Sequence, residues 1–379
     1  MTAMDAARGG AVLGQGKHGK TYDAVSDDPD SLLSELSEPG LRAKTWVAYV
    51  DGKASARGVK CDERKKVAVM EALQRAQKFV AKTFLGASNR TADESFELEM
   101  EMRRRVIEAF GGARPAKEYT TVASGMPVRG VGELVGLRVR AGGRGGRDAL
   151  FMVSSKCQVP LDRYNFSNAA DLVEMAGDIL DAFAVIHRGG LIHADVKLDN
   201  MVFCRDGPGR RFKLIDWGAS MHADALVRQY LDGGEPKNTA SPMAWYAWGL
   251  GRHMTINAFM LIHARHYIRT FMSSMGFVQF CTDAMVSFSA AARRMEHDSG
   301  MDERRVAREM LNQHVRSFDL YSFGIALAHL AYSSPAASRS PRTRRLLLSV
   351  ARALTHYNDD NFVGNDAAAA AHMLRSPLK

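Results

Sequence analysis

The segment Leu191–Phe203 is apolar at both ends but carries a dense group of polar side chains between them: His193, Asp195, Lys197, Asp199 and Asn200. Burying charge without a partner is costly, so the segment predicts a loop exposed at a cleft rather than a buried strand. Asp195 is suited to accept a proton from a hydroxyl group. Lys197 supplies positive charge at a point where negative charge would develop.

A second carboxylate is expected beside this loop. Asp216 follows the apolar run Phe212–Ile215, and the stretch from Asn200 onward predicts a hairpin whose tip, Arg205–Arg211, is rich in glycine and proline. The hairpin would bring Asn200 and Asp216 to the same open end. Mg²⁺ takes oxygen ligands of this kind, completed by substrate phosphates and water. The pair therefore predicts a magnesium site.

The surrounding sequence predicts the elements that hold these residues. A glycine-rich turn near the N-terminus leads into residues 25–76, which combine a polar loop with a hairpin around Asp51. Residues 77–157 predict strand, helix, strand and strand, with the helix over residues 93–110 stopped by two glycines. The last two strands flank the turn AGGRGGR. From residue 158 on, helical periodicity dominates, beginning with a long helix that ends at Gly189 and Gly190.

The motifs HADVKLDN and DWG resemble the catalytic loop and the magnesium-binding motif of the eukaryotic-type protein kinases. The resemblance extends to LGQGKHGKTY, where Gly14, Gly16 and Gly19 follow the order of the family's glycine-rich loop over the phosphates. It also extends to KFVAKTF, which places the phosphate-binding lysine of the family at Lys82. Its glutamate partner is expected at Glu99, which shares a helix face with apolar residues, whereas Glu97 and Glu101 lie off that face.

Two further segments resemble parts of the same family. In LFMVSSKC, Ser154 matches the back of the adenine pocket, and Ser155 to Cys157 match the ATP-binding hinge. In DLYSFGIALAHL, Asp319 matches the aspartate that anchors the backbone of the catalytic loop. The ordered matches run from about residue 13 to residue 330.

The resemblance implies an α+β, two-lobed protein-kinase-like fold with a small mainly-β lobe and a larger mainly-α lobe. Residues 1–157 would form the ATP-binding lobe, with an insertion at about 25–76, and residues 158–379 the catalytic lobe, with an insertion at about 250–316. The implied activity is ATP- and Mg²⁺-dependent phosphorylation of serine and threonine in proteins. Asp195 would be the base, Lys197 would stabilise the γ-phosphate, and Asn200 and Asp216 would bind Mg²⁺.

The chain departs from the family pattern in several places. Ala194 replaces the arginine that usually receives an activation-loop phosphate, so phosphorylation of that loop is not expected to be the switch. The segment between Asp216 and Asp319 is far longer than in the family and has no clear A-P-E motif. NTASPMAWYAW, residues 238–248, is its best candidate for a substrate-facing loop. This degree of divergence is similar to that of kinases from large DNA viruses.

Two other functions stay open. Small-molecule phosphotransferases of the aminoglycoside and choline kinase kind share the two-lobed fold and often carry I-D-W at the metal site, as Ile215–Trp217 does here. Lys197 and the DLYSFG segment count against that class. The second alternative is a catalytically weak pseudokinase scaffold, which the expected residue types at the catalytic positions disfavour.

The overall composition indicates which kinds of partner and which cellular compartment to expect. The 379 residues carry a formal net charge of +9, which favours acidic partners such as nucleic acid. The four cysteines are widely spaced and without a C-x-x-C, which argues against a zinc ribbon or a disulfide framework. No apolar run is long enough for a membrane span. We therefore expect an intracellular protein, cytoplasmic or nuclear, and within a host cell if the source is viral.

Overall fold

The computed structural model describes residues 12–16, 19–23, 45–51, 56–75, 79–84, 89–140, 149–155, 157, 159–205, 210–225, 228, 275–299, 315–357 and 359–376. Contacts divide the described residues into two units: unit 1 comprises those before Val159, and unit 2 those from Val159 onward. The secondary structure is mixed α and β, as expected. The expected lobe boundary after residue 157 lies beside this division. The roles assigned to the two lobes stay a prediction.

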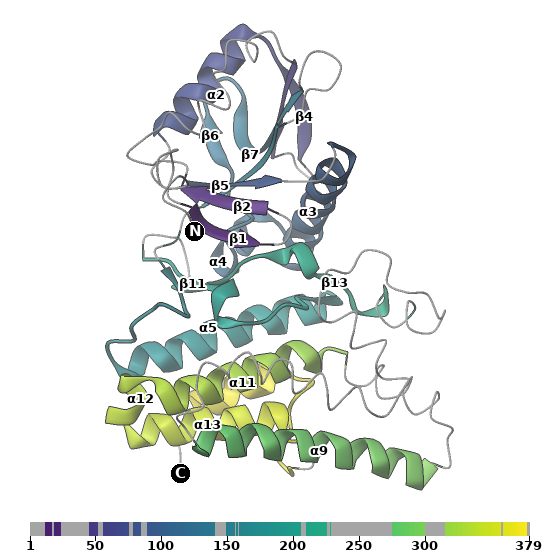
Figure 1. Ribbon diagram of the computed structural model, residues 1–379, viewed down its shortest axis with the longest axis vertical. Helices are drawn as coiled ribbons and strands as arrows, with labels where there is room; N and C mark the ends of the chain where they lie inside the picture. Colours follow the sequence, from purple (N-terminus) through teal and green to yellow (C-terminus); the bar gives the residue numbers. More distant parts are fainter. Residues whose placement is uncertain are drawn as a thin grey trace, which may run out of the picture. The chain divides into compact units, whose positions relative to one another are not determined.

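Unit 1 is built on an antiparallel, 8-stranded sheet (Figure 1). Its strands are β1 (Val12–Gly16), β2 (Gly19–Asp23), β3 (Thr45–Val50), β4 (Arg57–Cys61), β5 (Phe79–Phe84), β6 (Met126–Val128), β7 (Gly132–Arg140) and β8 (Ala149–Ser155). Their order is β1-β2-β5-β8-β7-β3-β4, with β6 paired to β7. The expected hairpins β3–β4 and β7–β8 are confirmed by their antiparallel registers. The AGGRGGR turn lies outside the described residues.

Two long helices, α2 (Glu63–Arg75) and α3 (Asn89–Ala109), pack on the sheet, and the short helix α4 (Ala113–Tyr119) follows α3. Side chains alternate between the faces of a strand, and β8 follows this rule. Phe151 and Val153 join a core cluster that includes Leu73 of α2. Leu150 and Met152 pack instead with Phe96 of α3. The apolar run of β8 is therefore continuous because both of its faces are covered.

The region expected to be an insertion, residues 25–76, supplies part of this core. β3 and β4 extend the sheet beyond β7, and Trp46, Ala48 and Val50 of β3 are buried in the same cluster as Leu73. Helix α2 itself was not expected from the sequence. The insertion is therefore integral to unit 1, because it completes one apolar face of the sheet.

Unit 2 is mainly helical. Its helices are α5 (Ala169–Arg188), α9 (Met275–Ser299), α11 (Ser317–Ser333), α12 (Pro335–Arg339), α13 (Pro341–Thr355) and α14 (Ala367–Arg375). Helix α11 is buried at every position from Ser317 to Ala331, and only its last residue, Ser333, is exposed, which is typical of a largely apolar helix in the centre of a helical unit. It packs against α5, α9, α12 and α13, and Figure 1 shows α5, α11 and α13 side by side.

Short strands and single helical turns in unit 2 carry the polar loop found in the sequence. They are β9 (Val159–Pro160), β10 (Leu191–Ile192), η2 (Leu198–Asn200), β11 (Met201–Phe203), β12 (Phe212–Leu214), η3 (Trp217–Ala219) and β13 (Met221–His222). β11 pairs with β12 and β9, and β10 pairs with β13. The antiparallel β11–β12 ladder confirms the hairpin expected between Asn200 and Asp216.

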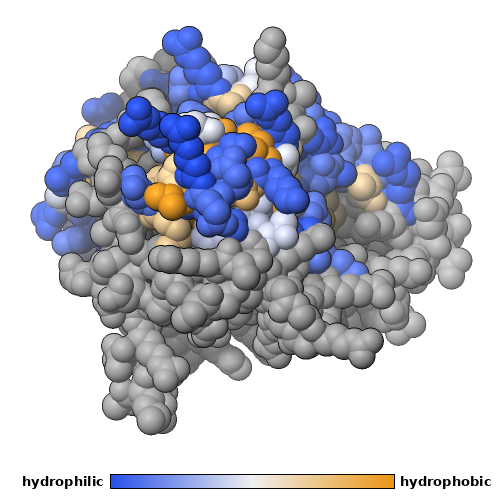
Figure 2. Space-filling view, turned by 90° about the horizontal axis from the view of Figure 1, so that it is seen from above, coloured by the Kyte–Doolittle hydropathy of each residue, from blue (hydrophilic) through white to orange (hydrophobic). Residues whose placement is uncertain are grey.

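The face seen in Figure 2 is mainly hydrophilic over its coloured part, with small apolar spots. Among the described residues, the large hydrophobic side chains that are exposed are Val67, Leu98, Met275 and Val286. Within the same residues, no helix combines the length and the apolar character needed to cross a membrane.

Several expectations fall on residues outside the described part of the chain. The candidate substrate-facing loop, residues 238–248, is among them. The same is true of the second expected insertion, residues 250–316, except for α9 and residues 315–316. The cysteines differ from expectation. Cys157 and Cys204 are disulfide-bonded, whereas Cys61 and Cys281 are buried free thiols. Their spacing contained no signal for a disulfide.

Candidate functional site

The polar loop of unit 2 follows α5 and β10 directly. Helix α5 ends at Arg188 and is capped by Gly189, and Gly190 reverses the chain with a φ of 77° before β10 begins. Within the loop, the side chains of Ala194, Val196 and Leu198 are buried, and those of the alternating residues Asp195 and Lys197 are partly exposed. This alternation explains the sequence pattern. The apolar residues anchor the loop, and the charged ones stay accessible.

Asp319 of α11 holds the backbone of this loop. Its Oδ2 accepts hydrogen bonds from the backbone N of His193 at 2.7 Å and from Nε2 of His187 at 2.9 Å. Its Oδ1 accepts one from the backbone N of Ala194 at 2.9 Å. Burial raises the pKa of Asp319, but the contacts with His187 and the His193 backbone outweigh burial and leave this pKa below its usual value. The expected anchoring role of Asp319 is confirmed.

The backbone at Ala194 adopts a left-handed conformation, with a φ of 65°. This conformation is rare for a residue other than glycine, and the hydrogen bond to Asp319 stabilises it here. The side chain of Ala194 is buried. A long side chain such as the arginine of the kinase pattern would have to leave this buried environment.

His193 is a structural link between two parts of the site. Its ring Nε2 donates to the backbone O of Ile215 at 3.0 Å, and its Nδ1 accepts from the backbone N of Asp195 at 3.3 Å. Both bonds together require the neutral ring with the proton on Nε2. The ring also packs against Trp217 at a centroid distance of 4.7 Å. His193 therefore joins the polar loop to the segment that carries Asp216.

Three of the predicted site residues meet at the carboxylate of Asp195. The Asn200 Nδ2 donates to the Oδ2 of Asp195 at 2.8 Å and to its backbone O at 2.8 Å. The Lys197 Nζ donates to the same Oδ2 at 3.1 Å. Within the part of the chain that the structure describes, both side-chain contacts of this carboxylate are made by Oδ2, and its Oδ1 makes none. One oxygen is thus held by two donors, and the other is left to accept a proton.

Asp216 follows β12 by two residues, and its neighbour Ile215 lies opposite Asn200 just beyond the β11–β12 ladder. The backbone N of Ile215 donates to the backbone O of Asn200 at 2.9 Å. Asp216 is exposed and has a φ of 59°. The Nδ2 of Asn200 donates to Asp195, so its Oδ1 is the side-chain atom that could ligate a cation. An amide oxygen and a carboxylate are hard oxygen donors, which fit Mg²⁺.

Among the described residues, no group of three or more histidine, cysteine, aspartate or glutamate side chains is arranged to hold a metal ion. Asn200 and Asp216 supply only two protein ligands, so the remaining ligands of a bound Mg²⁺ would come from phosphates and water.

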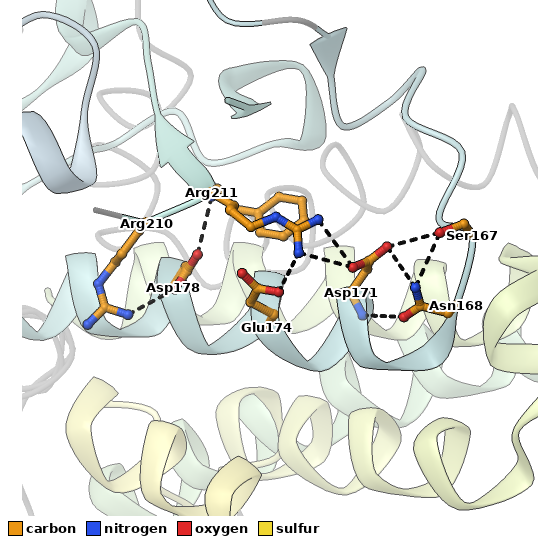
Figure 3. Close-up of polar contacts among 8 residues, drawn as sticks. Ser167, Asn168, Asp171, Glu174, Asp178, Arg210 and Arg211 are labelled. Carbon is orange, nitrogen blue, oxygen red and sulfur yellow. Dashed lines mark hydrogen bonds and ion pairs between the residues drawn. The ribbon is translucent and has the colours of Figure 1, made fainter. Parts of the chain in front are cut away.

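The hairpin that carries Asn200 and Asp216 is fixed to α5 by a cluster of ion pairs (Figure 3). Asp178 accepts hydrogen bonds from Arg210 Nη1 at 2.8 Å and from the backbone N of Phe212 at 3.2 Å. Arg211 donates to Glu174 at 2.8 Å and to Asp171 at 3.3 Å. These contacts hold the start of β12, and therefore the strand that leads to Asp216 two residues after its end.

Sequence reasoning missed these supporting residues. A signal for the cluster was present, because the acidic residues of α5 recur with helical spacing on one face: Asp171, Glu174, Asp178 and Asp181. Their arginine partners lie on a hairpin more than 25 residues later in the sequence, so the acidic residues alone are equally typical of a solvated helix face. His187 carried no comparable signal.

The predicted nucleotide-binding residues lie in unit 1. Gly14, Gly16 and Gly19 belong to the β1–β2 hairpin, in which Gly16 pairs with Gly19. Lys82 is in β5, where it pairs with Thr21 of β2 and Met152 of β8. Opposite residues of an antiparallel pair share a face, so position 82 lies on the face of Met152, which α3 covers.

Glu99 lies on α3, three residues after the buried Phe96, and is half-buried. Helix α3 contacts both β5 and β8. The helix face expected from the sequence is confirmed as buried at Phe96, Val106 and Phe110. Glu97 and Glu101 instead form surface ion pairs with arginines.

The two residues expected at the hinge follow in and after β8. Ser155 ends β8, and its hydroxyl lies 3.5 Å from the backbone O of Thr121, to which it donates. Cys157 is disulfide-bonded, so its thiol is not available to a ligand.

Comparison with known proteins adds no family assignment: no protein-family model matches the chain, and no curated protein matches its sequence.

Proposed function

We propose that this chain is a protein serine/threonine kinase with a two-lobed kinase-like fold, which transfers the γ-phosphoryl group of ATP to a protein hydroxyl. The observation that carries the proposal is the arrangement around Asp195. One of its carboxylate oxygens is fixed by Asn200 and Lys197, and the loop backbone is fixed by Asp319. A carboxylate held in this way is oriented before the substrate arrives.

In the proposed reaction, the substrate hydroxyl oxygen attacks the γ-phosphorus of ATP and its proton passes to the Oδ1 of Asp195. The bond from the γ-phosphorus to the bridging oxygen breaks, and ADP leaves with the bonding electrons. Lys197 offsets the negative charge on the transferred group. Mg²⁺, held by Asn200 and Asp216, would neutralise the phosphates of ATP when bound. Position 82 and Glu99 would place the α- and β-phosphates.

The experiment is transfer of labelled γ-phosphate from ATP in the presence of Mg²⁺, to the chain itself and to a generic basic protein. The Asp195→Asn variant keeps the shape of the side chain and removes the proton acceptor. We expect it to lower transfer by about 100-fold or more. Asp199→Asn is the matched control, because Asp199 is an exposed carboxylate in the same loop. Phosphoamino-acid analysis would identify the acceptor.

Phosphoserine or phosphothreonine made by the wild type and by Asp199→Asn, but not by Asp195→Asn, would support the proposal. Transfer only to small metabolites would identify a small-molecule phosphotransferase and contradict it. Equal transfer by Asp195→Asn and wild type would remove Asp195 from its assigned role. ATP binding without any transfer would identify a pseudokinase scaffold.

A further inference from the structure

Helix α3 carries a buried arginine that plays no part in the function proposed above. Arg103 is 3% exposed, and its Nη2 lies 2.7 Å and 2.8 Å from the two carboxylate oxygens of Asp51. Its Nε donates to the backbone O of Val122 at 2.8 Å. The guanidinium therefore ties α3 to two other segments of unit 1.

Asp51 belongs to the expected insertion. It directly follows β3, and its backbone N donates to the backbone O of Glu133 in β7 at 2.9 Å. The carboxylate is thus fixed to the sheet at the point where the inserted β3 joins β7. The partner of Arg103 is therefore held where β3 pairs with β7, inside the sheet.

The buried pair is not explained by its contribution to stability. Burial raises the pKa of Asp51 in spite of the opposing effect of Arg103, and burial lowers the pKa of Arg103 in spite of Asp51. In both groups the cost of leaving water outweighs the attraction between them. Buried ion pairs of this kind add little net stability compared with apolar residues, but they restrict geometry.

A second arginine fixes the first half of the same helix. Arg138 of β7 forms ion pairs with Asp93 at 3.2 Å and Glu97 at 2.9 Å. Glu99 lies between these contacts and Arg103, which is four residues later on the same face. Rotation of α3 about its axis would break contacts on both sides of Glu99.

We infer that Asp51 and Arg103 are positioning residues, through which the inserted β3–β4–α2 segment locks α3 with Glu99 directed to the face of the sheet that carries position 82. This inference rests on the proposed function, because it assigns Glu99 a role in ATP binding. In this arrangement the inserted segment holds α3 in one orientation, and no separate activating protein is needed to place Glu99.

The test removes both charges together, because removing one would leave the other buried and unpaired. The double variant Asp51→Leu/Arg103→Met keeps apolar volume at the contact, and Arg103→Lys is the conservative variant. Arg105→Met is the matched control: Arg105 lies on the same helix, is 45% exposed and pairs only with Glu101 among the described residues. Thermal unfolding identifies any variant that fails to fold.

Two readouts separate this inference from the proposed function. Hydrogen exchange over residues 89–109 reports on α3 without any reference to activity. Steady-state phosphoryl transfer gives kcat and the KM for ATP. We expect the double variant to exchange faster in α3 and to lose between about 10-fold and about 100-fold in kcat/KM for ATP, since a displacement of about 1 Å has costs of this size. We expect Arg103→Lys to be intermediate and Arg105→Met to match the wild type.

Unchanged exchange in a folded double variant would overturn the lock itself. Faster exchange with wild-type kinetics would overturn the link between α3 and ATP. Absence of transfer by the wild type, with faster exchange in the double variant, would contradict the proposed function and the role in ATP binding, and would leave the lock as a structural element.

Discussion

Replacing Asp319 by asparagine tests the anchor of the polar loop most directly. The carboxylate accepts three hydrogen bonds, two at Oδ2 and one at Oδ1, and it is 1% exposed, so water cannot replace a lost partner. Asparagine keeps the shape but has a single acceptor oxygen. Its NH₂ group must therefore face at least one of the three donors.

The size of the effect follows from these contacts. A buried donor left without a partner costs about 1–3 kcal/mol, and each remaining hydrogen bond loses about 1 kcal/mol when its acceptor becomes neutral. The sum is about 3–5 kcal/mol, which is a large share of the roughly 5–15 kcal/mol that stabilises a typical domain. We expect Asp319→Asn to lower the free energy of unfolding by this amount.

The assay is urea denaturation of the full chain at pH 7, followed by circular dichroism. Asp366→Asn serves as the control, because Asp366 caps α14 by accepting from the backbone N of Ala368 and Ala369. Asparagine caps helices about as well as aspartate, so this variant should change stability by less than about 0.5 kcal/mol. An effect of Asp319→Asn no larger than that of the control would refute the reasoning.

Three further predictions follow from other parts of the structure. Burial lowers the pKa of His329 from 6.5 to about 4, so that between these pH values the unfolded chain binds a proton that the folded chain does not. The free energy of unfolding should therefore fall by up to about 3 kcal/mol as the pH is lowered from 6.5 to 4. Urea denaturation should show a weaker pH dependence in the His329→Gln variant. Gly324→Ala should destabilise the chain by about 1–3 kcal/mol, since the new Cβ would lie 2.5 Å from Thr355 Cγ2. Gly177→Ala should instead stabilise it by about 0.5–1 kcal/mol, because the atom nearest to its new Cβ is 3.9 Å away. Thermal unfolding compares the two variants. Because Ala194 replaces the phosphate-receiving arginine, phosphatase treatment should leave phosphoryl transfer unchanged, and a loss of transfer would show that a phosphate is needed.

Much of the local structure could be predicted from patterns within short segments. The hairpins β3–β4, β7–β8 and β11–β12, the long helix α5 and the apolar face of α3 all follow from periodicity and turn residues. The grouping of Asp195, Lys197 and Asn200 could be predicted as well. These residues are neighbours in the chain, so backbone geometry alone keeps them close.

The supporting contacts could not be predicted in the same way. No role was assigned to Arg103 from the sequence, and its partner Asp51 was expected only as a turn residue. The disulfide-bonded state of Cys157 and Cys204 had no signal in their spacing. The contact between Asp51 and Arg103 joins residues that lie far apart in sequence, where charge or residue type matches many alternative partners equally well.

The difference between what the sequence predicts and what only the folded chain decides is clearest at the polar loop. The residue types from His193 to Asn200 are enough to predict a loop with a proton acceptor, a cation and an oxygen ligand. Only the folded chain decides that His193 is a neutral link, that Asp319 fixes the backbone and that one oxygen of Asp195 is held while the other is open. Chemical capacity belongs to the side chains, whereas orientation comes from partners that tertiary packing brings within hydrogen-bond distance.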